Sequence, residues 1–170
     1  MIVDSSAVVA ILLKEPGHDA LQAQIASADN VGLGAPTLVE SSLVLTARLG
    51  LVGKSLLARF VQEAEVHVVA FTADHWTIAA DAYTRYGKGR HPAALNLGDC
   101  LTYAVAKAAG EPLLCKGNDF PATDLPLADK APTSTADDAP NTDDDAPHVG
   151  NDVPHVGEPR RGRGEASPGA

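Results

Sequence analysis

Short apolar runs alternate with amphipathic stretches along the first 128 residues of the chain. Four of the apolar runs predict buried strands, at residues 2–3, 31–33, 66–69 and 112–114. Apolar positions at helical spacing predict helices at residues 7–13, 18–28, 36–48, 54–64, 73–86 and 97–109. Because strands that alternate with helices form parallel sheets covered on both faces, the pattern predicts an α/β fold.

The composition changes after Leu127. Residues 129–170 contain no Leu, Ile or Phe, carry six prolines, and repeat Pro-His-Val-Gly at 147–150 and 154–157. Such a segment cannot bury enough apolar surface to offset the entropy lost on folding. We therefore expect one folded domain, residues 1–128, followed by a disordered acidic tail rich in proline and glycine, residues 129–170.

The net charge of −9 is divided between both parts of the chain. Residues 1–128 contain nine Lys and Arg against thirteen Asp and Glu, whereas the tail contains four against nine. A negative balance argues against broad electrostatic binding of nucleic acid. It is compatible with an enzyme that holds cations locally and binds phosphate through them.

The sequence gives no sign of export or of a membrane anchor. The chain starts Met-Ile-Val-Asp without a basic leader, and its longest early apolar run, residues 7–13, is far too short to span a bilayer. Cys100 and Cys115 have neither a disulfide framework nor metal-ligand spacing. We expect a cytoplasmic protein with reduced thiols.

Four acidic residues fall at one kind of position. Asp4 follows the first strand, Glu40 and Asp99 lie in the first turns of predicted helices, and Asp119 follows the last strand after a short turn. In an open α/β sheet these positions line one edge. Clustered carboxylates repel one another unless a divalent cation neutralises them, and an all-oxygen set suits Mg²⁺ or Mn²⁺. Such sites hydrolyse phosphate esters with a metal-activated water.

Each acid also has a purely structural explanation. Residues 37–40 match a capping box, residues 96–99 come close to one, Asp4 suits a helix cap, and Asp119 suits a turn. Coincidence explains four such acids at one edge less easily than it explains one. On spacing alone, both interpretations stay open.

Four stretches together resemble the motifs of the VapC-type toxins of the PIN-domain ribonuclease family. They are Ile2–Ala7, Pro36–Glu40, Arg85–Ala104 and Lys116–Phe120, and the third is the most specific. They occur in the order of the family and span about residues 1–127. Each is a weak signal by itself, whereas the ordered set is strong.

The resemblance implies a PIN-like three-layer fold with a central parallel sheet of four or five strands. It implies the toxin of a type II toxin–antitoxin system, an endoribonuclease that depends on Mg²⁺ or Mn²⁺. It places Asp4, Glu40, Asp99 and Asp119 at the catalytic metal site, with Ser6 as a supporting hydrogen-bonding group. Metal-activated water would leave a 5′-phosphate and a 3′-hydroxyl.

One position departs from the family pattern. Asn118 stands where many relatives carry a second acid beside the last Asp, which weakens the case for a second metal. It also leaves open a catalytically weak or inactive PIN-like module that binds RNA or a protein. A phosphatase with a nucleophilic Asp4 is disfavoured because Ser6 stands where such sites carry a second Asp.

Arg85, Lys88 and Arg90 form a basic stretch just before the Asp99 motif and are candidates for contact with RNA. The alternative is an ordinary solvated loop. The four histidines of residues 1–128 lack the paired spacing of a histidine-based ribonuclease; they are at positions 18, 67, 75 and 91.

The resemblance also implies partners. They are an RNA substrate, with tRNA or rRNA expected, and a cognate VapB-type antitoxin that covers the acidic pocket. The apolar stretches 43–51 and 56–61 offer a groove for an antitoxin helix or the face of a homodimer, with core packing as the alternative for each Leu.

Overall fold

The computed structural model describes residues 1–128 of the chain. The tail expected at residues 129–170 lies outside the described residues, and its disorder remains a prediction.

A parallel sheet of four strands forms the centre of the described part. The strands are β1 (Ile2–Val3), β2 (Gly32–Gly34), β3 (His67–Val69) and β4 (Leu113–Leu114), in the order β3-β2-β1-β4. All three pairings are parallel, and Ile2 lies opposite Gly32 on one side and Leu113 on the other. The predicted α/β class and parallel sheet are confirmed, with strands that differ from the predicted runs by one residue at their ends.

All six predicted helices are present among the described residues. They are α1 (Ser5–Leu12), α2 (His18–Ala26), α3 (Ala35–Leu49), α4 (Leu51–Glu63), α5 (Ala73–Tyr86) and α6 (Leu97–Ala109), followed by a short 3₁₀ helix, η1 (Phe120–Ala122). The predicted start of α4 at residue 54 is wrong. Gly50 has a φ of 65°, which turns the chain directly from α3 into α4. Gly53 then packs against the backbone of Leu45, where a side chain would clash.

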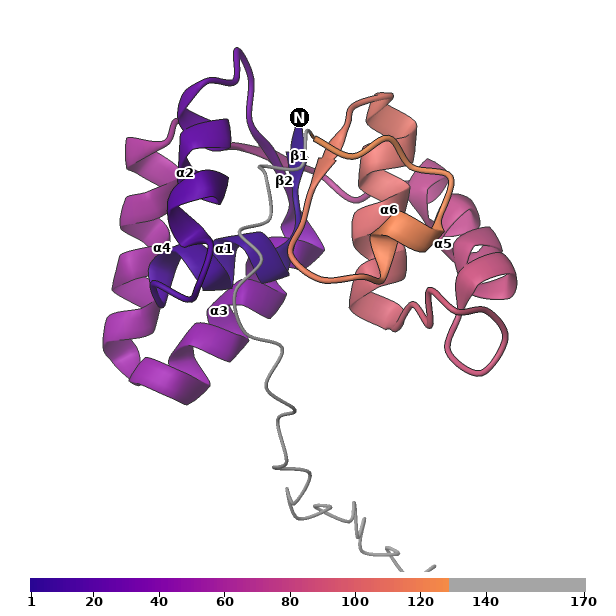
Figure 1. The fold of residues 1–170 in the computed structure, drawn as a ribbon, viewed down its shortest axis with the longest axis horizontal. Coiled ribbons are helices and arrows are strands. Elements are labelled where there is room, and N and C mark those ends of the chain that lie inside the picture. The colour runs from indigo at the N-terminus through magenta and orange to yellow at the C-terminus, as the bar shows by residue number, and fades with distance from the viewer. Residues whose placement is uncertain (129–170) are drawn as a thin grey trace, which may run out of the picture. The chain divides into compact units, whose positions relative to one another are not determined.

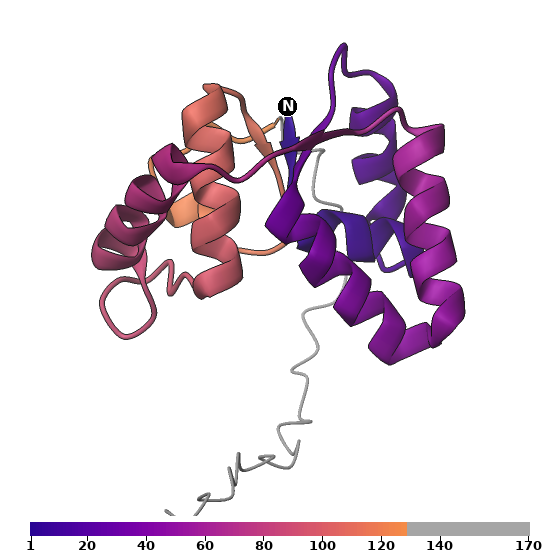
Figure 2. The same ribbon diagram turned by 180° about the vertical axis from the view of Figure 1, so that it is seen from behind.

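Helices cover both faces of the sheet, which confirms the predicted three layers. Helices α1 to α4 gather on one side, and α5, α6 and η1 gather on the other, as both views show (Figures 1 and 2). Because neighbouring side chains of a strand face opposite ways, Ile2 packs in the cluster with α5 and α6, whereas Val3 packs in the cluster with α1 and α4. Leu113 and Leu114 divide in the same way.

Neither Cys100 nor Cys115 forms a disulfide in the described part of the chain. Burial, and then the charge of Asp99, raises the pKa of Cys100 to about 11, so this thiol stays protonated near neutral pH. Among residues 1–128, no helix combines the length and the apolar character that crossing a membrane requires.

Candidate active site

Asp4 ends β1 and caps α1. Its side chain is 3% exposed, and Oδ2 accepts hydrogen bonds from Ser6 N at 2.9 Å and from Ser6 Oγ at 2.6 Å. The capping role that the sequence suggested is therefore confirmed. It uses only one carboxylate oxygen, because Oδ1 is buried without a hydrogen-bond partner. A buried carboxylate oxygen in that condition is unfavourable unless something binds it.

Ser6 connects Asp4 to the loop after β4. Its Oγ donates to Asp4 and accepts a hydrogen bond from Lys116 N at 3.0 Å. Lys116 Nζ also pairs with Glu15 at 2.7 Å, which ties the same loop to the end of α1. These contacts fix the loop that carries the exposed Asp119 beside the start of α1.

Glu40 lies in the second turn of α3, so its predicted place in a first turn is wrong. The helix starts at Ala35 with Gly34 as its N-cap. The capping box expected at residues 37–40 is absent, because Thr37 lies inside the helix and is buried. Burial raises the pKa of Glu40, a hydrogen bond with Ser5 lowers it, and the charge of Asp4 raises it.

The charges of the other three acids all act on Asp99. It lies in the first turn of α6, where the expected capping box is formed: Asp99 N donates to Asn96 Oδ1 at 3.0 Å, and Asn96 N donates to Asp99 Oδ2 at 2.8 Å. Its pKa is raised to about 6, mainly by burial and also by the charges of Asp4, Asp119 and Glu40, while the hydrogen bond from the Asn96 backbone acts to lower it. Asp99 is therefore close enough to each of the other three acids to be repelled by their charges.

Two features that sequence reasoning missed hold α3 against α6. Thr37 Oγ1 and Thr102 Oγ1 share a buried hydrogen bond of 2.9 Å. Gly98 packs directly against the carboxylate of Glu40, since a Cβ at this position would lie 2.5 Å from Oε1. Glycine disfavours a helix, so its presence in the first turn of α6 was the one sign in the sequence that another group packs closely there.

The donor set fits a hard divalent cation, although the described side chains do not form a closed ligand cage. No group of three or more His, Cys, Asp or Glu within residues 1–128 has an arrangement that could hold a metal ion. The acids nevertheless offer only oxygen donors, the partnerless Oδ1 of Asp4, and the mutual repulsion felt at Asp99. A bound cation would relieve the last two conditions, and its binding would require these side chains to draw together.

Arg85, one of the three candidates for RNA contact, takes part in a cluster around Asp124. Its guanidinium donates to Tyr86 Oη at 2.7 Å and lies 3.6 Å from Asp124 Oδ2. Asp124 also accepts hydrogen bonds from Tyr103 Oη at 2.6 Å and from Lys107 Nζ at 3.1 Å. The hydrogen bond from Tyr103 is the main cause that lowers the pKa of Asp124 to about 2. This cluster fastens the segment after η1 to α5 and α6, which gives Arg85 a structural role.

Lys88 and Arg90 are exposed in the turn between α5 and α6. The guanidinium of Arg90 lies 5.5 Å from the centre of the Tyr83 ring. Both cations therefore stay available to a ligand near the start of α6.

The two apolar stretches expected to bind a partner differ in exposure. In the first stretch, Leu43 is 67% exposed on α3 and Leu51 is 84% exposed at the start of α4. Val39, which precedes this stretch on α3, is 59% exposed. In the second stretch, residues 56–61, Leu57 is buried in the core, which agrees with the alternative that its leucines serve core packing. The first stretch therefore leaves an apolar surface next to Glu40, and the second stretch mainly packs.

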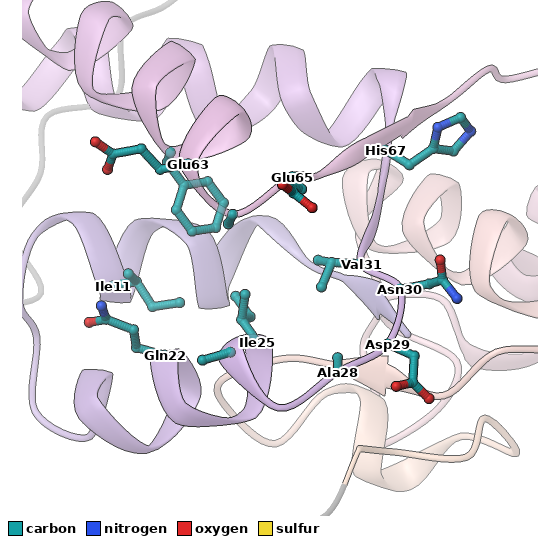
Figure 3. Close-up of a pocket in the computed structure, with 13 residues that line it drawn as sticks. Ile11, Gln22, Ile25, Ala28, Asp29, Asn30, Val31, Glu63, Glu65 and His67 are labelled. Carbon is teal, nitrogen blue, oxygen red and sulfur yellow. The ribbon is translucent and has the colours of Figure 1, made fainter.

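A separate hollow of about 490 Å³ lies among α1, α2 and α4 (Figure 3). Ile25 and Val31 lie on its apolar side, and acidic side chains of Asp29, Glu63 and Glu65 surround it. None of the four predicted site acids lines it. It is therefore distinct from the acidic site.

Replacing Gly98 with Ala is expected to impair the site while leaving the fold intact. The new Cβ would displace the carboxylate of Glu40, whereas alanine favours the helix by about 1 kcal/mol over glycine. If Glu40 is part of the catalytic site that the resemblance implies, RNA cleavage should fall by roughly tenfold or more, as for a displaced catalytic group. The free energy of unfolding in urea should stay equal or rise, and a large drop in it would contradict this account.

Comparisons with known proteins show the family to which the chain belongs. Residues 1–125 match the PIN domain family. Ribonuclease VapC36 of Mycobacterium tuberculosis is 50% identical over 126 residues, which cover 74% of this chain and 91% of that protein. Ribonuclease VapC of Mycolicibacterium smegmatis is 42% identical over 125 residues, which cover 74% and 97%.

Solved structures share the fold at low sequence identity. VapC20 of Mycobacterium tuberculosis, described as a sarcin–ricin loop cleaving toxin, superposes with a TM-score of 0.62 at 22% identity and covers 73% of this chain and 95% of its own. VapBC2 of Rickettsia felis, solved with a fragment of promoter DNA, gives 0.59 at 17% identity and covers 75% and 96%. The chain therefore belongs to the PIN domain family and, within it, to the VapC ribonucleases.

Proposed function

We propose that this chain is the toxin of a type II toxin–antitoxin system, an endoribonuclease that hydrolyses RNA phosphodiester bonds with the help of Mg²⁺ or Mn²⁺. The observation that carries the proposal is the shared electrostatic environment of Asp99, which feels the charges of Asp4, Asp119 and Glu40. Acids brought together from four distant segments have no common structural purpose in the described part. A site for a divalent cation gives them one.

In this mechanism the protein positions the acids. Asp4 and Asp99 present carboxylates whose other oxygens are fixed by Ser6 and Asn96, so each can turn little. Glu40 and Asp119 complete the donor set. A bound Mg²⁺ or Mn²⁺ would supply activation of water and neutralisation of charge on the leaving oxygen. Cleavage would then leave a 5′-phosphate and a 3′-hydroxyl.

The partners follow from the same proposal. The RNA substrate is expected to be a structured tRNA or rRNA. A VapB-type antitoxin would cover the acidic site, and the exposed Val39 and Leu43 beside Glu40 offer it an apolar contact. The same apolar surface could instead form the interface of a homodimer.

A second candidate function is a PIN-like module that binds RNA or a protein without cutting. Two observations favour it: Asn118 replaces an acid, and the described acids form no closed ligand cage. The raised pKa of Asp99 favours the nuclease, because a binding module gains nothing from repulsion among neighbouring acids.

Mapping of RNA 5′ ends after brief induction tests the proposal. Induction of the unsubstituted chain should produce a few preferred new ends that carry 5′-phosphate, and induction of the Asp99→Asn variant should produce none. In vitro, the same cuts should require Mg²⁺ or Mn²⁺ and disappear in EDTA. Equal cleavage in EDTA, or equal cleavage by the variant, would contradict the proposed function.

A further inference from the structure

A second hollow, with a largely apolar lining, lies between α5 and the start of α6. It has a volume of about 600 Å³, and its lining includes Phe71, Trp76, Tyr83, Leu97 and Leu101. The proposed mechanism uses none of these side chains. Three of them are unusually open to solvent, since Trp76 is 62%, Tyr83 is 45% and Leu97 is 73% exposed. Apolar side chains gathered in an open hollow of this size indicate a binding surface.

The hollow adjoins the acidic site through the first turn of α6. Asn96 and Cys100 both line it, and they lie on either side of Asp99 in the sequence. Asn96 also holds the backbone N of Asp99 through its side chain at 3.0 Å. A ligand in the hollow therefore lies within one helical turn of Asp99. An RNA strand with one phosphate at Asp99 can place a neighbouring nucleotide there.

The charges around the hollow favour a nucleic acid as its occupant. Lys88 lines it, and the guanidinium of Arg90 lies 5.5 Å from the centre of the Tyr83 ring. None of the described side chains that line it is acidic. Lysine is depleted in protein–protein interfaces. Sites for single-stranded nucleic acid combine positive charge with exposed aromatic faces on which bases stack.

We propose that this hollow binds one unpaired nucleobase of the RNA substrate, stacked on Trp76, with Lys88 and Arg90 contacting the adjoining phosphates. The inference rests on the proposed function, because the nucleotide it names is a neighbour of the bond that is cut. Only a base outside a duplex can enter a hollow and stack on a side chain. The hollow would therefore direct cleavage to loops and single strands, and it would tolerate different bases.

Trp76 is the single tryptophan of the chain, so its fluorescence reports on the hollow directly. The titration uses the full chain with Asp99→Asn, which preserves the shape of the side chain and prevents cleavage. An unpaired RNA hexanucleotide should quench the fluorescence, and a duplex of the same sequence should not. Equal quenching by both, or none by either, would overturn the inference.

Two substitutions at Trp76 measure the contribution of stacking. Trp76→Ala should weaken binding of the labelled hexanucleotide by about tenfold, the size of one lost base stack. Trp76→Phe should retain most of the affinity, because a ring remains. Val52→Ala is the matched control: it truncates a side chain that is 62% exposed on α4, as Trp76 is on α5, and it should leave the affinity unchanged. Equal losses in Trp76→Ala and Val52→Ala would overturn the inference.

Failure of this inference can be told apart from failure of the proposed function. Quenching at Trp76 by RNA, together with no RNA cleavage by the unsubstituted chain, would contradict the proposed function and support binding of a nucleotide in this hollow. Cleavage with an unchanged KM in Trp76→Ala would support the function and overturn this site. A molecular mass that halves in Trp76→Ala, without any quenching by RNA in the parent chain, would assign the hollow to a second copy and also overturn it.

Discussion

Replacing Asp99 with Asn is expected to abolish most RNA cleavage and to stabilise the metal-free protein. The amide keeps the shape of the side chain, and its oxygen can still accept the hydrogen bond from Asn96 N, so the cap of α6 survives. The substitution removes a half-buried charge that Asp4, Asp119 and Glu40 repel. We expect the single-turnover rate to fall by at least about a hundredfold, as the loss of a metal ligand implies.

The matched control for this variant is Asp81→Asn. Asp81 is an exposed acid on α5 that lies outside the site, so neither the cleavage rate nor the stability should change. Urea unfolding at pH 7 in EDTA should show a higher midpoint for Asp99→Asn than for the unsubstituted chain. If Asp99→Asn cleaves RNA as fast as the control does, Asp99 is not part of the active site.

The metal-free protein is expected to lose stability as the pH rises from about 4 to about 6. Asp99 has a pKa of about 6 in the folded protein and an ordinary value of 3.8 otherwise. The folded state therefore holds a proton that the unfolded state has released between these pH values. The stability that this proton gives is lost as the pH rises through about 6. Urea unfolding in EDTA across this range measures it.

A divalent cation should reverse this loss. Because protons and the cation compete for the same carboxylates, Mg²⁺ should stabilise the protein more at pH 7 than at pH 5. The stabilisation by Mg²⁺ in the unsubstituted chain, minus that in Asp99→Asn, gives the contribution of Asp99. The depressed pKa of Asp124, about 2, acts in a lower range, where stability is lost as the pH falls below about 4. A pH profile that is identical in the two proteins would contradict the account.

Local patterns predicted the elements of the fold because local physics decides them. Apolar runs such as Ile2–Val3 and Leu113–Leu114, separated by helical patterns, predicted a parallel sheet. They also predicted that Asp4 follows the carboxyl end of one of its strands. Asp99 was also predictable as a capping residue, since its partner Asn96 lies only three positions away. Contacts of this range can be read from spacing alone.

Long-range packing decided what the sequence could not predict. The start of α3 at Ala35 moved Glu40 into the second turn and turned Thr37 from an expected cap into the partner of Thr102, 65 positions away. The close approach of Gly98 to Glu40 depends on the same pairing of helices. Neither contact has a signature in spacing, because the distance between α3 and α6 is set by the core beneath them.

Binding of Mn²⁺, followed by electron paramagnetic resonance, tests the central claim most directly. The account predicts that the unsubstituted chain binds Mn²⁺ at pH 7, and that Asp4→Asn and Asp99→Asn each weaken this binding strongly while Asp81→Asn does not. If both site variants bound Mn²⁺ as tightly as the unsubstituted chain, these acids would not hold the cation, and the account of the site would be wrong.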